Sequence, residues 1–148
     1  MTEKKTTIPP AVNAMMKFIL RSPLHGMVSK TITVISFTGR KSGKLYSTPV
    51  SYSQNGDQVT IFTHGEWYKN LAGGTPVTLR IQGKDYTGQA EVTVDDKAAM
   101  SVALTGHLKA VRSDAKYYHV TFEEAGEPKK EEIEKAVNDV VMIRVILK

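Results

Sequence analysis

Apolar residues recur at helical spacing near the start of the chain. In residues 11–21 they follow the i, i+3, i+4, i+7 pattern and predict an amphipathic helix, with a polar stripe that includes Lys17 and Arg21. Pro23 disfavours helical backbone at the residue before it, so we expect the helix to end there. Two interpretations fit this helix: it covers one end of a folded barrel, or its basic face contacts anionic lipid as a peripheral membrane segment.

Between Thr31 and Val94 the pattern changes to that of strands. Residues 31–37 are dense in β-branched side chains and predict a strand that is buried on both faces or bulged. Residues 46–53 have the alternating pattern of a strand, so every second side chain lies on the same face. The residues on that face are Tyr46, Thr48, Val50 and Tyr52.

Two turn signals join the alternating runs into hairpins. The Asn55-Gly56 pair predicts a tight hairpin in which both central residues take positive φ. Gly83-Lys84 predicts a second hairpin turn. Short strands at hairpin spacing are typical of a small barrel or sandwich. The runs joined by these turns are 46–53 with 58–63, and 77–82 with 86–94.

The last third of the chain predicts helices and a closing strand. Asp95 or Asp96 can cap a helix with one apolar side, and Pro128 opens a second helical segment with glutamates in its first turns. Residues 140–147 are apolar and predict a strand that returns to the sheet. The pattern therefore predicts a mainly β fold, a β-barrel with a few helices. The inward side chains of the two helices are Met100, Ala103, Leu104, His107, Leu108 and Val111, and then Ile133, Ala136 and Val137.

Composition is that of one ordinary folded domain. The chain has 148 residues, 41% of them apolar and 24% charged, so we expect a single domain over residues 1–148 with residues 1–10 flexible.

The chain contains no cysteine, which excludes disulfides, thiolate catalysis and Cys-ligated metal centres. No apolar run reaches the roughly 20 residues that cross a bilayer. The N-terminus lacks the apolar stretch of a secretory signal, so we expect a cytoplasmic protein.

The positive charge is concentrated in the first half of the sequence. Residues 1–74 contain nine Lys/Arg and three Asp/Glu, whereas residues 75–148 contain eleven and twelve. This asymmetry indicates an anionic partner for the first half: phosphate, polycarboxylate, nucleic acid or a membrane surface. Single-stranded nucleic acid is disfavoured, because Tyr46 and Tyr52 share a strand face without the flanking cations that such binding needs.

The loop over residues 39–44, Gly-Arg-Lys-Ser-Gly-Lys, is the first candidate for binding chemistry. It is one residue short of a Walker phosphate loop, has Leu45 in place of the hydroxyl residue, and leads into a strand, so nucleotide triphosphate hydrolysis is not indicated. Two glycines, a hydroxyl and three cations nevertheless suit phosphate. The alternative is a solvated basic turn that binds nothing.

The second candidate is the stretch over residues 63–71, which predicts a strand end followed by one helical turn. It contains the single tryptophan of the chain, Trp67, and Gly73-Gly74 is expected to end the turn. In one interpretation Trp67 and Leu71 plug the barrel. In the other, Trp67 or Tyr68 lies against a planar ligand whose orientation the Asn70 amide fixes.

The histidines and tyrosines give weaker signals. None of the four histidines has metal-ligand spacing, so no metal site is expected. His107 is interpreted as a packed core residue, and His64 is the one histidine expected near a site. Tyr117 and Tyr118 could donate a proton or simply pack.

Three ordered segments resemble a known family. They are MKFILRSPLH (16–25), FTGRKSGKLYSTPVSY (37–52) and EWYKNLAGGTPVTLRIQGK (66–84). In order and spacing they resemble the deazaflavin-dependent nitroreductases and quinone reductases. Those proteins belong to the split β-barrel group that includes the pyridoxamine-phosphate-oxidase-like flavin proteins. The resemblance covers residues 12–94 and implies an FMN-binding-like split barrel with an N-terminal helix and C-terminal helices.

The resemblance also implies a cofactor and the positions that hold it. The cofactor would be the deazaflavin coenzyme F-420, with FMN as the alternative, and the basic first half suits a tail of phosphate and glutamates. Some members have a longer loop before the tryptophan and a lysine near the position of His64. The matching positions are Arg40, Lys41, Ser42, Gly43 and Lys44 for the phosphate and tail, Pro49 and Val50 along the ring, Thr63 and His64 near its reactive edge, and Trp67 and Asn70 for the ring and ribityl portion.

The expected activity follows from that cofactor. The protein would orient reduced F-420 while the ring passes hydride to a quinone, a nitroaromatic or an activated enone. The proton would come from solvent or from the catalytic candidates Tyr117 and Tyr118. Split-barrel relatives commonly pair, so a homodimer is expected. The alternatives are an FMN-binding oxidoreductase or oxidase-like protein, and a barrel that binds a cofactor or nucleic acid without catalysis.

Overall fold

The computed structural model describes residues 31–148 of the chain. The predicted helix over residues 11–21, its membrane contact and the flexibility of residues 1–10 lie outside the described residues. Within residues 31–148, no helix has both the length and the apolar character required to cross a membrane.

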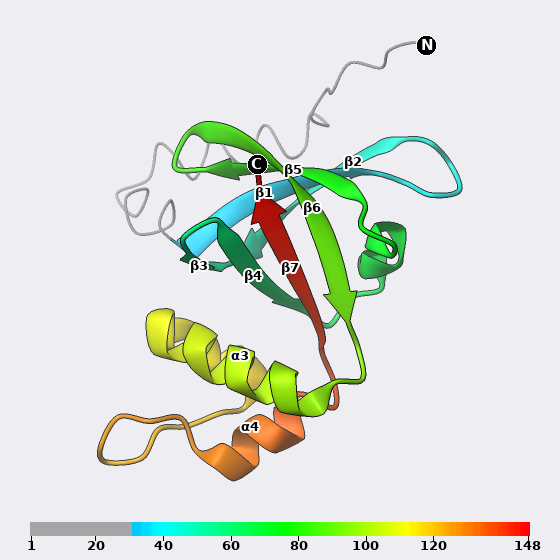
Figure 1. Ribbon diagram of the computed structural model, residues 1–148. Coiled ribbons are helices and arrows are strands. Elements are labelled where there is room, and N and C mark those ends of the chain that lie inside the picture. Colours follow the sequence, from blue (N-terminus) through cyan, green and yellow to red (C-terminus); the bar gives the residue numbers. More distant parts are fainter. Residues whose placement is uncertain (1–30) are drawn as a thin grey trace.

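One seven-stranded antiparallel sheet dominates the described chain (Figure 1). Its spatial order is β2-β1-β5-β6-β7-β4-β3. The two edge strands follow one another in the chain and are joined through Tyr52, so the sheet curls into a half-barrel, as the sequence predicts. The strands are β1 (Ile32–Thr38), β2 (Leu45–Ser51), β3 (Ser53–Asn55), β4 (Gln58–Thr63), β5 (Pro76–Ile81), β6 (Lys84–Thr93) and β7 (Val141–Leu147).

The hairpin of 77–82 with 86–94 forms as predicted. The prediction that the whole run 46–53 pairs with 58–63 is wrong: only residues 53–55 pair with β4, because residues 45–51 form β2 and pair with β1 instead. Each turn is displaced by one residue. Asn55 is the last residue of β3 and pairs with Gln58, so the central residues are Gly56 and Asp57, and only Gly56 has positive φ. A turn with glycine at its first central position needs just one positive φ. In the second hairpin Lys84 pairs with Ile81 as part of β6. Its central residues are Gln82 and Gly83, which both have positive φ.

The first strand is buried on both faces, as its β-branched composition predicts. Residues 33–37 are all buried, so side chains on both faces of the strand are shielded from solvent. Its buried hydroxyls are satisfied across the sheet: Thr33 Oγ1 donates to the Arg80 carbonyl at 2.7 Å, and Ser36 Oγ lies 2.8 Å from Ser47 Oγ. Burial of this strand therefore leaves no hydroxyl without a partner.

The helices that follow β6 lie at one end of the half-barrel and create a second core (Figure 1). Asp96, not Asp95, caps α3: its Oδ1 accepts from the Ala99 amide at 3.1 Å. Met100, Leu104 and Leu108 are fully buried against the outer face of β4 and β7. The first core fills the barrel itself. The helical elements are η1 (Trp67–Leu71), α3 (Lys97–Ala110), η2 (Arg112–Tyr118) and α4 (Lys130–Ala136), where η denotes a 3-10 helix.

A buried polar network fastens the helical layer to the sheet. His107 on α3 is 1% exposed; its Nδ1 lies 3.0 Å from Ser53 Oγ, and its Nε2 lies 2.9 Å from Asp114 Oδ2 on η2. Ser51, at the end of β2, also donates to that carboxylate. His107 is thus a core residue with hydrogen-bonded partners, as interpreted from its place on an apolar stripe.

Glycine is required where β6 crosses β7. A Cβ at Gly88 would lie 2.5 Å from the Ile146 carbonyl oxygen, so we expect Gly88→Ala to lower the free energy of unfolding by about 1–3 kcal/mol through overpacking. Gly106→Ala is the matched control, because a Cβ there meets nothing within 4 Å; it should instead stabilise α3 by about 0.5–1 kcal/mol. Urea unfolding measures both. Equal effects would contradict this account of Gly88.

Candidate functional site

The loop between β1 and β2 is closed by its own backbone. The Gly39 amide donates to the Lys44 carbonyl at 2.7 Å, and the Gly43 amide donates to the Gly39 carbonyl at 3.0 Å. Gly43 has φ +71°, a conformation that favours glycine. A Cβ at Gly39 would lie 2.6 Å from the Tyr46 ring and 2.8 Å from Ser42 Oγ. Both glycines of the motif are therefore required by the geometry of this loop.

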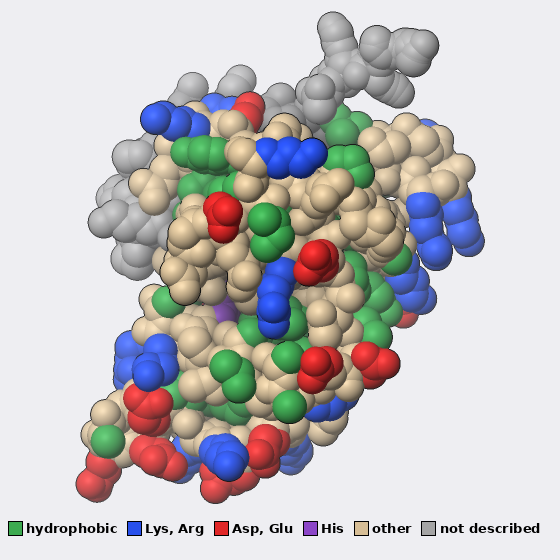
Figure 2. Space-filling view, viewed as in Figure 1, with side chains coloured by type: hydrophobic (Ala, Val, Ile, Leu, Met, Phe, Trp, Pro, Cys, Tyr) green, Lys and Arg blue, Asp and Glu red, His purple; other side chains and the backbone are tan. Residues whose placement is uncertain are grey.

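The three cations of the loop are exposed. Arg40, Lys41 and Lys44 form no ion pair with any carboxylate of residues 31–148. Lys and Arg side chains gather at the edge of the molecule where the β1–β2 hairpin projects (Figure 2). Unpaired cations beside a closed loop favour binding of an anion.

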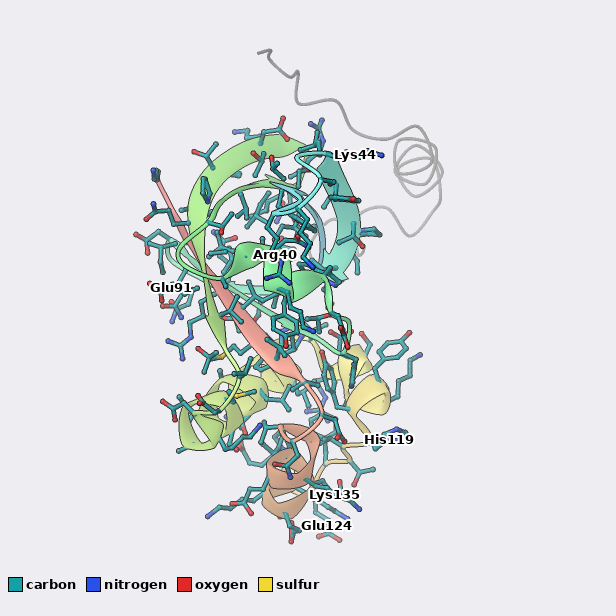
Figure 3. The ribbon with its side chains drawn as sticks, turned by 90° about the vertical axis from the view of Figure 1, so that its right-hand side faces the viewer. Arg40, Lys44, Glu91, His119, Glu124 and Lys135 are labelled. Atoms are coloured by element: carbon teal, nitrogen blue, oxygen red, sulfur yellow. The ribbon has the colours of Figure 1, made fainter. Side chains whose placement is uncertain are left out.

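Asn70 joins this loop to η1. Its Oδ1 accepts from the Arg40 amide at 2.9 Å, and its Nδ2 donates to the Trp67 carbonyl at 3.0 Å. Figure 3 shows Arg40 beside η1, whereas Lys44 lies away from it toward the outer part of the hairpin. The amide therefore fixes the position of the loop relative to the tryptophan.

Aromatic rings form a flat wall next to the loop. Phe37 and Trp67 stack with ring centroids 5.5 Å apart at 17°, and Tyr46 stacks on Phe37 at 6.0 Å and 26°. Register explains the second contact, because Phe37 pairs directly with Tyr46 across the hairpin. Gly65 approaches the indole so closely that a Cβ there would lie 3.0 Å from its Cδ1. A planar ligand can stack on such a wall.

The loop and the wall enclose a cavity of about 330 Å³. Five predicted residues line it: Arg40, Lys41, Ser42, Trp67 and Asn70. The other five were not predicted as cofactor contacts, although three of them lie inside the two candidate stretches 39–44 and 63–71. The remaining two, Phe37 and Tyr46, could have been found from the strand register across the hairpin. The missed residues are Phe37, Gly39, Tyr46, Glu66 and Lys69.

The other predicted cofactor positions do not line this cavity. Pro49 pairs with Val34 in the middle of β2, and Val50 packs against the barrel core. Thr63 ends β4, and its Oγ1 accepts from the Gly65 amide at 3.0 Å. Gly43 and Lys44 belong to the loop but are likewise not among the lining residues.

His64 lies away from the cavity and contacts one of the two candidate tyrosines. The His64 ring stacks on Tyr118 with centroids 5.5 Å apart at 29°. Tyr118 is buried, and burial raises the pKa of its phenol well above the ordinary value of 10.0, with the Asp114 charge adding to the shift. Tyr117 is 63% exposed and lies beneath the Lys116 ammonium. Neither tyrosine lines the cavity, so their catalytic role stays a prediction.

Within residues 31–148, no group of three or more His, Cys, Asp or Glu side chains is placed to hold a metal ion. The cavity itself offers cations, hydroxyls, aromatic rings, the Asn70 amide and the Glu66 carboxylate, which is paired with Lys69. Such a set can bind a phosphate or carboxylate together with a flat ring.

Solved structures place this fold among the split β-barrel proteins. A protein related to general stress protein 26 of B. subtilis (pyridoxinephosphate oxidase family), from Clostridium acetobutylicum, is 15% identical with a TM-score of 0.57, over 89% of this chain and 84% of that one. A FAD-binding protein from Mesorhizobium loti is 14% identical with a TM-score of 0.50, and the match covers 86% of this chain and 90% of that one. An F-420-H2 dependent reductase is 17% identical with a TM-score of 0.50, and the match covers 80% of this chain and 95% of that one.

The family follows from the sequence. Residues 23–121 match the model of the F-420H(2)-dependent quinone reductase family. Because this match covers more than half of the chain, the protein belongs to that family and is an F-420-dependent reductase in the broad sense. The resemblance carried by the three segments is thereby confirmed. A comparison with curated proteins gives no match.

The raised pKa of Tyr118 predicts a loss of stability in base. Below about pH 10 the Tyr118 phenol is protonated in both the folded and the unfolded protein. Above that pH the unfolded chain loses this proton while the folded protein still keeps it. The free energy of unfolding should therefore fall by up to about 1.4 kcal/mol per pH unit. Tyr118→Phe should remove this component, and Tyr117→Phe serves as the control. Denaturant unfolding from pH 9 upward, to roughly pH 12, measures the effect. Parallel curves for wild type and Tyr118→Phe would contradict the assignment.

Proposed function

We propose that this protein binds reduced F-420 at the cavity between the β1–β2 loop and η1 and reduces a quinone. Family membership supports the cofactor. The observation that carries the proposal is the junction of unpaired cations with an aromatic wall, fixed by the two hydrogen bonds of Asn70. A nitroaromatic or an activated enone would be reduced by the same hydride chemistry.

The residues present fit the two parts of such a cofactor. Arg40 and Lys41 line the cavity and would hold the phosphate and the carboxylates of the tail, with Ser42 Oγ as a hydroxyl contact and Lys44 as a further cation along the loop. Trp67, backed by Phe37, offers its indole to the ring. Pro49, Val50, Thr63 and His64 would extend the contact beyond the cavity.

The chain contributes binding and orientation to the reaction. When bound, reduced F-420 supplies the hydride. Asn70 is a positioning residue here, because its amide bonds lie within the chain and hold Arg40 beside the tryptophan. The stack of Phe37 on Trp67 excludes water from one side of the indole. Tyr117, the exposed tyrosine, is the better candidate for protonating the acceptor, because burial makes Tyr118 a weaker acid.

Charge reversal in the loop tests the site. Lys41→Glu should weaken F-420 binding about tenfold to a hundredfold, because one charge-assisted contact to phosphate or carboxylate is lost and a like charge is introduced. Lys135→Glu changes the charge equally but lies on α4, far from Arg40 in Figure 3. It should bind F-420 like the wild type. Calorimetric titration of the three proteins measures the difference.

The same titration, repeated with FMN, distinguishes the two candidate cofactors, and a turnover assay then tests the acceptor. FMN carries a phosphate but no glutamate tail, so wild type should prefer F-420, and the preference should shrink in Lys41→Glu. Tighter binding of FMN would make the protein an FMN-binding oxidoreductase of the same fold. Unchanged F-420 affinity in Lys41→Glu would refute the tail assignment. Turnover of menadione with reduced F-420, compared with a nitroaromatic and an enone, then tests the proposed acceptor.

A further inference from the structure

A second and larger cavity lies on another part of the molecule. It has a volume of about 650 Å³ and forms a groove between α3 and the outer face of β3, β4 and β7. Figure 1 shows α3 lying below these strands. The groove shares no lining residue with the cavity at the β1–β2 loop. The proposed reductase function leaves it unused.

Arg144 on β7 supplies an unmet hydrogen-bond donor in this groove. Its Nε is buried and has no hydrogen-bond partner, and it is the one such side-chain atom among the described residues. Glu91 stands opposite Arg144 on β6, yet the two side chains form no ion pair within 4.0 Å. A buried donor without an acceptor is costly and is usually satisfied by protein, water or a ligand. Because this Nε has almost no accessible surface, a ligand in the groove would meet the terminal amino groups of the guanidinium, which form no ion pair with any carboxylate of residues 31–148.

Gly106 keeps the groove open from the side of α3. It lies in the interior of that helix, where glycine costs about 0.5–1 kcal/mol relative to alanine. A Cβ at this position would meet nothing within 4 Å, so no close contact in residues 31–148 requires the glycine. Its effect on the structure is to widen the groove.

The two walls of the groove differ in character. Apart from His107, whose ring nitrogens are already paired, the α3 wall is small and apolar, and its Val102 side chain is 75% exposed. The sheet wall is polar: Thr60 and Arg144 are paired across β4 and β7, and amide side chains continue it toward β3. A guanidinium in a fork geometry matches a carboxylate in two parallel hydrogen bonds, and an apolar wall suits a hydrocarbon portion.

We propose that this groove is a second ligand site, which binds a small organic carboxylate: the carboxylate meets Arg144, and the hydrocarbon part lies along the α3 wall. The site is independent of the proposed F-420 site. Its ligand would pair with the terminal amino groups of the Arg144 guanidinium and cover the exposed apolar wall in one step.

Octanoate is the probe for this site, followed by NMR of the full-length, 15N-labelled protein. It should shift the side-chain N–H signals of the Arg144 guanidinium, together with shifts in amides of α3 and β4. Arg144→Gln should weaken binding at least about tenfold, because the charge-assisted contact is lost. Gly106→Leu should abolish binding by filling the groove, while circular dichroism shows the helix content retained.

The controls separate charge, hydrocarbon and fold. Arg80→Gln removes an arginine that pairs with Asp85 and does not line the groove, so it should bind octanoate like the wild type. 1-Octanol and inorganic phosphate should each bind much more weakly than octanoate. Equal binding of either would refute the proposed ligand class. Guanidinium N–H signals of Arg144 that octanoate leaves unmoved would refute the site. F-420 titration of Gly106→Leu should stay unchanged, which keeps the two proposals distinguishable.

Discussion

The contact of Asn70 with both Arg40 and Trp67 is the constraint on which the candidate site depends. Without it, the β1–β2 loop is a projecting hairpin tip and η1 is a short connection between β4 and β5. With it, the backbone of the cation-bearing loop is held at a fixed position beside the indole. Because a 3-10 helix of five residues has little stability of its own, this anchoring also depends on Leu71, which is fully buried in the barrel core.

The half-barrel makes this junction possible by bringing distant segments together. Strand β1 lies between β2 and β5, so the loop that follows β1 and the helix that precedes β5 meet at the same end of the sheet. The helical layer is attached elsewhere, to β4 and β7, through its own core and the His107–Asp114 network. One sheet thus carries two separate cavities, and a change in one need not disturb the other.

The fold was largely predictable because its signals are local. Alternation and glycine turns give the hairpins, and helical spacing gives α3 and α4. The positions of the turns were not predictable from residue type. Asn55 tolerates the αL conformation, yet it stays in β3 and pairs with Gln58, so strand pairing outweighs that preference here.

The site was predictable only where a motif covers it. Glu66 and Lys69 line the cavity but form an ordinary i,i+3 ion pair that carries no sequence signal. The cross-strand neighbours of Arg144, which are Thr60 on β4 and Glu91 on β6, could not be predicted, because strand order depends on long-range packing.

The single tryptophan gives the most direct test of the central claim that a flat redox ring lies beside Trp67 when the tail is held by the loop. Titration of the protein with F-420, monitored by tryptophan emission and by ultrafiltration in parallel, measures contact and binding separately. The account predicts that emission is quenched in proportion to the bound cofactor. Binding by ultrafiltration without any change in the emission of Trp67 would place the ring elsewhere and contradict the account.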